Sequence, residues 1–358
     1  MIFKDLKAFL LKILTRKKIN NFELLSVKTI LFLRYDRIGD MVLTTPVFRE
    51  FKKAFPAVNL FVLASKANAD VISNNPYVDR VFLNNKNNFF KDLLTLFALR
   101  KMSIDVCVEF DHSVIPHAIL RLKIIRPKKI ISVFKSGRYG ISGSELELYD
   151  FYVEKKNKEH FRDIWLRTLE PFGIAPESNK YDLFPSQAQL RTADDFLGKT
   201  PSRKILIGLN LEGAVKGKKI KVADAIKIIE KIQNVRQDTF FIILTSPKNH
   251  FAICKDPFIQ RKDGLMVSYE TIGVMDMAAL ISKLDMIITP DTSIVHIASA
   301  YNLPVVSVHE NNIDSYNLFR PTSSKSHTVF SKKSDSLEGF SLNNLVDNSL
   351  GIINGIEK

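Results

Sequence analysis

Short apolar runs alternate with helical patterns along most of this chain, and that alternation constrains its fold more than any other feature. Residues 29–34 have the length and composition of a buried strand, and a helical pattern follows at about 41–55. The same patterns predict strands at 60–64, 81–83, 105–110, 130–134, 204–209, 240–244, 286–289 and 305–308. They predict helices at about 88–100, 116–124, 159–172, 222–233, 275–283 and from 342 onward. Strands separated by helices are typical of βαβ units, so we predict an α/β protein with parallel sheets.

The alternation is interrupted in the middle of the chain. Residues 137–158 are polar and loop-like, and residues 173–201 are rich in proline and polar residues. A stretch of that composition is typical of a domain boundary. We therefore predict two doubly wound, Rossmann-like domains, 28–185 and 186–358, with a cleft between them and a separate N-terminal segment, 1–27.

The charge balance favours an anionic partner. The net charge of +14 is compatible with nucleic acid, an acidic membrane surface or a phosphorylated substrate, although the lysines could also serve only solubility. Because they are spread along the chain without a recognisable nucleic-acid module, we expect no nucleic-acid partner. Cys107 and Cys254 form no metal or disulfide pattern, so we expect reduced, buried thiols and a cytoplasmic location. The chain has no apolar run long enough for a transmembrane helix.

The first residues have the pattern of a basic amphipathic helix. One helical face carries the apolar residues Phe3, Leu6, Leu10, Ile13 and Leu14, and lysines and arginines lie outside that face. Such a helix can lie on anionic lipid. The alternative is a helix that packs against its own domain.

The first candidate site follows the strand at 29–34. Arg37, Gly39 and Asp40 come directly after this strand, where ligands bind in open α/β sheets. Gly39 allows a tight turn or a close backbone approach. Asp40 can cap the following helix, or it can accept a proton from a substrate hydroxyl. Asp111, just past the strand at 105–110, is expected to face the same side.

The second candidate site is the loop at 210–219, which contains Gly213, Lys218 and Lys219. Glycines and lysines after a buried strand are suited to phosphate binding, although the loop is not a P-loop and could be only a solvated basic loop. The third candidate is the segment 290–296 at a predicted helix start. Asp291, Thr292 and Ser293 can cap that helix while its first N–H groups bind an anion. His296 lies one turn further on, and the histidines show no metal-ligand spacing.

Together these residues resemble glycosyltransferase family nine, the heptosyltransferases that build the lipopolysaccharide inner core of Gram-negative bacteria. The N-terminal part of the resemblance is residues 30–40 followed by Thr45-Pro46. The C-terminal part is residues 286–297, where the family carries Asp-Thr-Gly and a histidine three residues later. Residues 76–81 are also similar, and the whole resemblance spans roughly residues 28–330.

The resemblance implies a GT-B fold, in which two Rossmann-like domains face a central cleft. It implies an inverting transfer, without a metal or other cofactor, from ADP-heptose to the Kdo/heptose-lipid A acceptor, an anionic glycolipid. Asp40 would be the general base in the acceptor-binding domain, and Arg37, Gly39 and Asp111 would bind the acceptor. The donor-binding residues would be Gly213, Lys218 or Lys219, Asp291, Thr292, Ser293 and His296. The protein would be cytoplasmic, with possible attachment to the inner-membrane surface.

Three positions depart from the family pattern and keep alternatives open. Ser293 replaces a glycine, Ile220 stands where a tryptophan often follows the phosphate lysine, and residues 309–312 replace Gly-Pro-Thr. The donor could therefore be another nucleotide-sugar, or the acceptor a protein. A non-catalytic nucleotide-sugar-binding protein is the alternative from a different class.

Overall fold

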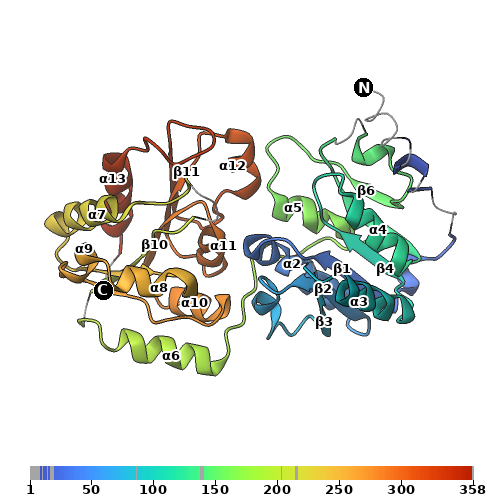
Figure 1. The fold of residues 1–358 in the computed structure, drawn as a ribbon, viewed down its shortest axis with the longest axis horizontal. Helices are drawn as coiled ribbons and strands as arrows, with labels where there is room; N and C mark the ends of the chain where they lie inside the picture. The colour runs from blue at the N-terminus through green and yellow to red at the C-terminus, as the bar shows by residue number, and fades with distance from the viewer. Residues whose placement is uncertain are drawn as a thin grey trace. The chain divides into compact units, whose positions relative to one another are not determined.

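The computed structural model describes residues 9, 11–13, 15–16, 20–85, 87–137, 141–202, 204–213 and 217–356. The chain divides into two compact units, Met1–Lys180 and Tyr181–Lys358. Each unit contains one parallel sheet with helices packed on it (Figure 1). Among the described residues, no helix combines the length and the apolar character needed to cross a membrane.

The first unit contains a six-stranded parallel sheet in the order β3-β2-β1-β4-β5-β6. Its strands are β1 (Thr29–Arg34), β2 (Asn59–Ser65), β3 (Arg80–Asn84), β4 (Val106–Glu109), β5 (Lys129–Val133) and β6 (Phe151–Val153). Its α-helices are α2 (Ile38–Ala54), α3 (Phe89–Lys101), α4 (Pro116–Ile125) and α5 (Phe161–Leu166). Its short 3₁₀ helices are η1 (Leu24–Ser26), η2 (Ala69–Ile72), η3 (Gly143–Glu145) and η4 (Arg167–Phe172).

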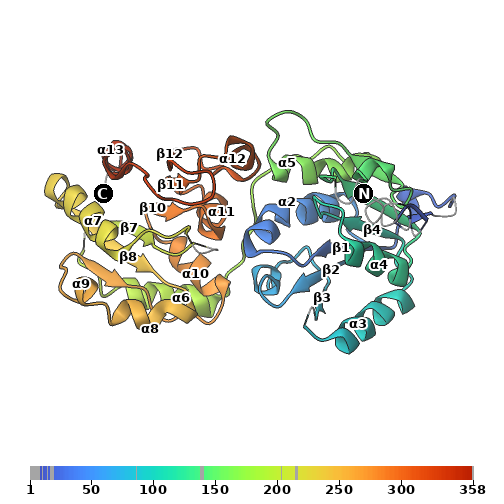
Figure 2. The ribbon, with the colours of Figure 1, turned by 45° about the horizontal axis from the view of Figure 1, so that its top comes forward.

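The second unit repeats this architecture with the strand order β12-β11-β10-β7-β8-β9 (Figure 2). Its strands are β7 (Ile205–Asn210), β8 (Thr239–Leu244), β9 (Leu265–Val267), β10 (Met286–Pro290), β11 (Val305–His309) and β12 (Ser326–Phe330). Its helices are α6 (Gln187–Leu197), α7 (Val222–Val235), α8 (Pro247–Cys254), α9 (Pro257–Gln260), α10 (Val274–Ile281), α11 (Ser293–Ala300), α12 (Ile313–Phe319) and α13 (Leu342–Ile353). The predicted α/β class with two Rossmann-like domains is confirmed.

Both sheets have the doubly wound order in which the chain direction across the sheet reverses once. The reversal lies between β1 and β4 in the first unit, and between β7 and β10 in the second. Ligands of such folds bind at the carboxyl ends of the strands beside this switch point. The central strands are almost wholly buried because helices cover both faces of each sheet. This topology therefore positions the loops after β1, β4, β7 and β10 as the candidate ligand-binding loops.

Several elements depart from the sequence-based prediction. Residues 137–158 include β6, residues 173–201 include α6, and β9 and β12 also escape the apolar-run criterion. The missed strands lie at or next to sheet edges, where one neighbour is absent, and they are short or partly exposed. The helix expected at 159–172 is divided into α5 and η4, and Pro171 lies within the second part.

The N-terminal segment and the cysteines were also predicted only in part. Leu11 and Thr15 are buried in the first unit, whereas Phe9 and Ile13 are exposed. The other residues of the predicted apolar face, Phe3, Leu6, Leu10 and Leu14, lie outside the described residues. Both cysteines are free thiols, as predicted, but only Cys107 is buried. Cys254 is half-buried because α8 has no buried residue.

Candidate functional site

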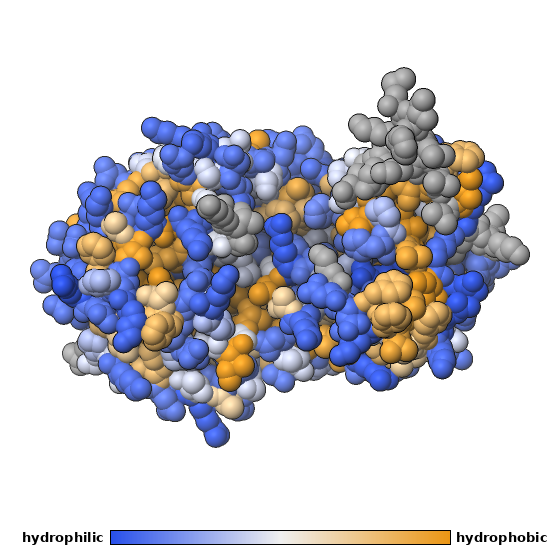
Figure 3. Space-filling model, viewed as in Figure 1, coloured by the Kyte–Doolittle hydropathy of each residue, from blue (hydrophilic) through white to orange (hydrophobic). Residues whose placement is uncertain are grey.

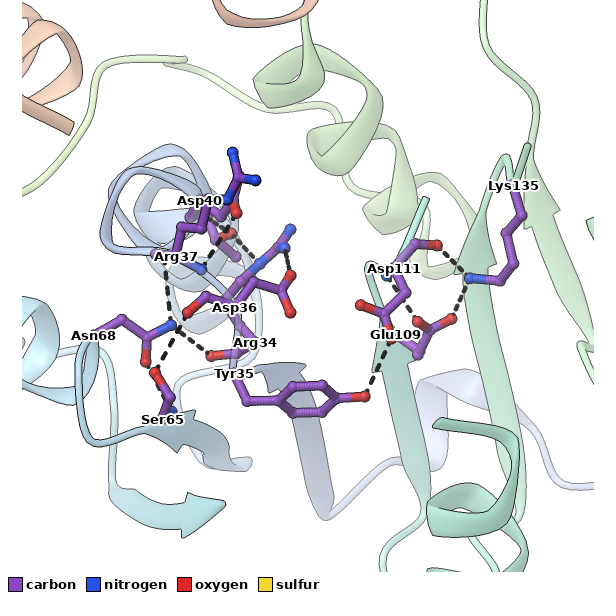
Figure 4. Close-up of polar contacts among 11 residues, drawn as sticks. Arg34, Tyr35, Asp36, Arg37, Asp40, Ser65, Asn68, Glu109, Asp111 and Lys135 are labelled. Atoms are coloured by element: carbon purple, nitrogen blue, oxygen red, sulfur yellow. Dashed lines mark hydrogen bonds and ion pairs between the residues drawn. The ribbon is translucent and has the colours of Figure 1, made fainter. Parts of the chain in front are cut away.

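The carboxyl ends of β1 and β4 bring charged side chains together at the switch point of the first unit (Figure 4). The loop after β1 carries Asp36 and Arg37 and leads directly into α2, whose first turn contains Asp40. β4 ends at Glu109, with Asp111 two residues beyond. These residues come from two segments about 70 positions apart, and the parallel pairing of β1 with β4 makes them neighbours.

Asp40 lies at the third position of α2 and is almost fully buried. Its carboxylate accepts a hydrogen bond from the backbone N–H of Arg37 at 3.4 Å, so it does contribute to capping the helix. Burial raises the pKa of Asp40 above its ordinary value, and the nearby charge of Arg34 opposes part of that increase. A buried carboxylate with a raised pKa is a stronger base than an exposed aspartate, which is what proton abstraction from a hydroxyl requires.

The buried side chain of Arg34 contacts both the loop after β1 and helix α2. Its side chain is 1% exposed, and its guanidinium carbon lies 3.8 Å from the centroid of the Trp165 ring. Arg34 Nη1 pairs with Asp36 at 2.7 Å, and Nε donates to Thr44 Oγ1 at 3.0 Å. Thr44 Oγ1 in turn donates to the backbone carbonyl of Asp40 at 2.7 Å. A guanidinium buried on an aromatic ring thus joins the end of β1 to the first turn of α2.

A second buried cluster follows β4. Glu109 pairs with Lys135 and accepts from the backbone N–H of Asp111 at 2.7 Å, and Asp111 accepts from the hydroxyl of Tyr35 at 3.1 Å (Figure 4). Burial alone would raise the pKa of Glu109, but the adjacent Lys135 outweighs it and the pKa is lowered. Burial and then the charge of Glu109 raise the pKa of Asp111 well above its ordinary value. The two carboxyls therefore differ in proton affinity, with Asp111 the one that holds a proton more readily.

The remaining predicted residues of this unit lie beside Asp40. Arg37 is exposed and immediately precedes α2, whereas Gly39 lies within the first turn of α2 and not in the turn before it. The loop is also held by Asn68, just after the neighbouring strand β2, whose amide donates to the carbonyl of Arg34 at 3.1 Å. Ser65 donates to the carbonyl of Asp36 at 3.4 Å. Arg37, Gly39, Asp40 and Asp111 are thus all found at the carboxyl edge of one sheet.

In the second unit, the switch point is organised by Asn210, the last residue of β7. Its side-chain amide donates to Thr289 Oγ1 at 2.9 Å and to Thr292 Oγ1 at 3.2 Å, which ties β7 to the turn after β10. Thr292 is the N-cap of α11 and accepts from the N–H of Ile294 at 3.3 Å. The predicted helix start is confirmed, with Thr292 as the cap and Ser293 as the first helical residue. A serine is accommodated there because that backbone is helical and needs no positive φ.

Lys218 lies between two carboxylates in this unit. Its Nζ is 3.5 Å from Asp291 Oδ2 and 2.7 Å from Glu310 Oε2, the residue directly after β11. The lysine therefore reaches the turn at the start of α11, where the helix N–H groups are directed. Lys219, the other candidate for the phosphate lysine, is exposed. The pairing with Glu310 shows that the charge of Lys218 is already balanced without a ligand.

The two glycines of this loop have distinct structural roles. A Cβ atom at Gly213 would lie only 1.6 Å from the carbonyl oxygen of Lys218, so no side chain fits there. Gly217 has φ +94°, a conformation that L side chains rarely adopt. The absence of a side chain at Gly213 thus lets its backbone approach that of Lys218.

Two buried histidines lie near Asp291. His296, in α11, is buried, and burial lowers its pKa to about 4. His309, at the end of β11, is also buried with a lowered pKa, and its Nδ1 lies 3.9 Å from Asp291 Oδ1. Both imidazoles are therefore neutral at pH 7. Among the described residues, His296 Nδ1 and His309 Nε2 are buried without a hydrogen-bond partner.

The sequence analysis included Arg34 and Asn210 in its candidate segments but assigned no role to them or to Glu109, and it noted Glu310 only as a departure from the family pattern. The signal for Asn210 and Glu109 was available, because each is a polar residue at the carboxyl end of an otherwise apolar strand. Within the described part of the chain, no group of three or more histidine, cysteine, aspartate or glutamate side chains is placed to hold a metal ion.

Comparison with known proteins matches the region that contains the C-terminal motif, residues 286–297. The family model described as glycosyltransferase family 9 (heptosyltransferase) matches residues 271–343, which contain α10, β10, α11 and β11. The chain is 24% identical over 324 residues to putative lipopolysaccharide heptosyltransferase 4 of Escherichia coli strain K12, covering 86% of this chain and 82% of that protein.

Solved structures show the same fold over nearly the whole chain. The glycosyl transferase family 9 protein of Veillonella parvula DSM 2008 has a TM-score of 0.75 at 16% identity, covering 94% of this chain and 99% of that one. E. coli heptosyltransferase WaaC with ADP has a TM-score of 0.67 at 12% identity, covering 90% and 99%. The predicted GT-B fold is confirmed by this agreement. Residues 271–343 therefore match the model of glycosyltransferase family 9, and the chain as a whole is similar to the heptosyltransferases.

Proposed function

We propose that this glycosyltransferase transfers heptose, with inversion, from ADP-heptose to the lipopolysaccharide inner core. The observation that carries the proposal is Asp40, a buried carboxylate of raised pKa at the switch point of the first sheet. The donor is suggested by the relatives: one is named a lipopolysaccharide heptosyltransferase, and one solved neighbour holds ADP. The proposed acceptor is a Kdo/heptose-lipid A glycolipid, which is anionic and matches the net charge of +14.

In the proposed reaction, Asp40 accepts the proton of the acceptor hydroxyl as its oxygen attacks the anomeric carbon of the donor. The bond from that carbon to the diphosphate oxygen breaks, and the nucleoside diphosphate leaves with the electron pair. Arg37, Gly39 and Asp111 are the proposed acceptor contacts. One displacement of this kind inverts the configuration at the anomeric carbon.

The leaving diphosphate is proposed to bind at the start of α11. Lys218 supplies a positive charge, and the helix supplies free N–H groups at Thr292 and Ser293. Asp291 holds the lysine, Gly213 gives the loop its shape, and the neutral His296 offers a hydrogen bond. Lys219 is a weaker candidate because it is exposed. These groups would stabilise the departing charge themselves, so we propose that the reaction needs no metal or other cofactor.

The experiment is transfer by the purified protein from ADP-heptose to Kdo-lipid A, with the product identified by mass spectrometry, in the presence and absence of a chelator. We expect a single heptose to be added at an equal rate in both conditions. Loss of transfer with the chelator would refute the metal-free step. A screen of other nucleotide-sugars and of lipid-free protein acceptors tests substrate identity, since transfer only in that screen would replace the proposed substrates. Donor binding without transfer to any acceptor would identify a nucleotide-sugar-binding protein instead.

Because the proposed acceptor is linked to lipid, the protein must reach a membrane surface to act on it. We propose that the protein works on the cytoplasmic face of the inner membrane as a peripheral protein. Fractionation of cells that express the full chain tests this, with membrane-associated protein released by high salt as the expected result. Protein found only in the salt-free supernatant would contradict it.

A further inference from the structure

The outer face of α3 is apolar and exposed. Phe90, Leu94 and Phe97 follow one another at helical spacing, and their side chains are 77%, 69% and 43% exposed. Phe89 is exposed beside them, with its ring centroid 5.9 Å from that of Phe90. Figure 3 shows this surface as an apolar patch over α3. A contiguous apolar patch of this kind marks a surface that contacts another apolar phase.

The exposed apolar residues Phe89, Phe90, Leu94 and Phe97, called the outer stripe below, do not pack in the core of the unit. The opposite face of α3 carries Leu96 and Leu99, which are buried in the core of the first unit. α3 is therefore anchored by one face and presents a second apolar face outward. A soluble surface helix ordinarily carries polar residues there, so the outer stripe needs another explanation.

The charges around the stripe are positive. α3 contains the exposed residues Lys91, Arg100 and Lys101 and a single acidic residue, Asp92. Asp92 is paired with Arg121 at 2.9 Å, and α4, which packs beside α3, contains no acidic residue. An aromatic and aliphatic stripe flanked by lysine and arginine is complementary to an anionic bilayer, in which the rings enter the interface and the cations meet lipid phosphates.

The inner face of α3, opposite the exposed apolar residues, is linked to the proposed acceptor site. Arg121 of α4 bridges Asp92 of α3 and the ring of Tyr35, with the guanidinium carbon 4.7 Å from the ring centroid. Tyr35 donates to Asp111 at 3.1 Å. Only this short chain of side chains therefore separates α3 from a residue proposed to bind the acceptor.

We propose that the outer stripe of α3, Phe89, Phe90, Leu94 and Phe97, is the membrane-docking surface of this protein, and that its partner is an anionic lipid bilayer. The inference rests on the proposed lipid-linked acceptor, because docking through α3 would bring the bilayer to the unit that contains Asp40 and Asp111. It differs from docking by the N-terminal segment, because it assigns the insertion to α3.

The experiment measures co-sedimentation of the full chain with vesicles of phosphatidylglycerol and phosphatidylethanolamine, without any substrate. The test variant carries Phe90→Gln, Leu94→Gln and Phe97→Gln, and the matched control carries Phe251→Gln and Phe258→Gln, two exposed phenylalanines of the second unit. We expect the α3 variant to bind the vesicles at least about tenfold more weakly than the wild type, and the control to bind like the wild type. Vesicles of phosphatidylcholine alone should bind the wild type poorly.

A second variant does not depend on removing apolar side chains. In Phe90→Trp, brominated lipid should quench the new fluorescence, while the buried Trp165 of the wild type provides the background. Equal vesicle binding by the α3 variant and the wild type, or no quenching of the new tryptophan, would overturn the proposal. A second copy of the chain would replace the bilayer as the partner if the α3 variant lost only self-association in sedimentation velocity.

Failure of this proposal can be distinguished from failure of the proposed function. Vesicle binding needs no donor, and transfer to a detergent-solubilised acceptor needs no vesicle. Transfer without α3-dependent vesicle binding refutes only the docking surface. Vesicle binding through α3 without transfer refutes only the proposed reaction.

Discussion

Glu310 competes with the donor for Lys218, and its removal should strengthen nucleotide binding. Glu310→Gln keeps the size of the side chain but removes the charge that lies 2.7 Å from Lys218 Nζ. The diphosphate proposed to bind this lysine would then meet a cation paired only with Asp291, and one fewer negative charge. We therefore expect tighter binding of ADP by the variant than by the wild type.

The structure sets the size of the effect. Two unit charges at this separation interact by about 6 kcal/mol at an effective dielectric constant of about 20. The two side chains are 18% and 12% exposed, so solvent and desolvation leave a net pair energy on the order of 1–3 kcal/mol. That range corresponds to an affinity about fivefold to about 150-fold higher.

Isothermal titration calorimetry with ADP is the appropriate assay. Glu177→Gln is the matched control, because Glu177 is an exposed carboxylate of the first unit paired with Lys53, and the affinity of this variant should equal that of the wild type. Weaker ADP binding by Glu310→Gln would refute the reasoning, because it would show that Glu310 contacts the nucleotide and does not compete with it.

Three further predictions concern stability and the site loops. Asp40→Asn should raise Tm at neutral pH. Because burial raises the pKa of Asp40 in the folded state, the protonated carboxyl stabilises the fold at low pH, and this stabilisation is lost as the pH rises. The increase in Tm caused by Asn should therefore grow with pH in calorimetric scans. Arg34→Met should move the acidic limb of the pH profile of kcat/KM to higher pH, because the charge of Arg34 lowers the pKa of Asp40; an unmoved limb would contradict this. Gly213→Ala should weaken ADP binding at least about tenfold, because the new Cβ displaces the backbone of Lys218; Gly351→Ala, in open space, is the control for both ADP binding and Tm.

The central strands could be predicted from sequence because burial on both faces gives each of them a continuous apolar run. β1 was predicted with its observed bounds, and most other central elements within a few residues. β6, β9 and β12 could not be found this way, because they are short or carry polar residues at or near the sheet edges. α6 was missed although Ser186 and Gln189 form a capping box before its apolar positions.

The candidate site was predictable where it follows directly from strand ends. The residues after β1 and β10 were identified because a helix start at a strand end is visible in sequence. The start of α2 was expected later, at Met41, because the N-cap residue of α2, Arg37, is not one of the preferred capping residues. The pairing of Lys218 with Glu310 was not predictable, since it joins loops about 90 residues apart that only the sheet order makes neighbours.

The most direct test of the account is the rate of transfer by Asp40→Asn, measured together with the affinity for the donor. The amide can still accept the hydrogen bond from Arg37, so the helix start and the fold should be retained. We predict a kcat about 10²–10⁴-fold lower, with unchanged affinity for ADP-heptose, because only the base is removed. Transfer at a rate near that of the wild type would show that Asp40 is a capping residue and would contradict the central claim.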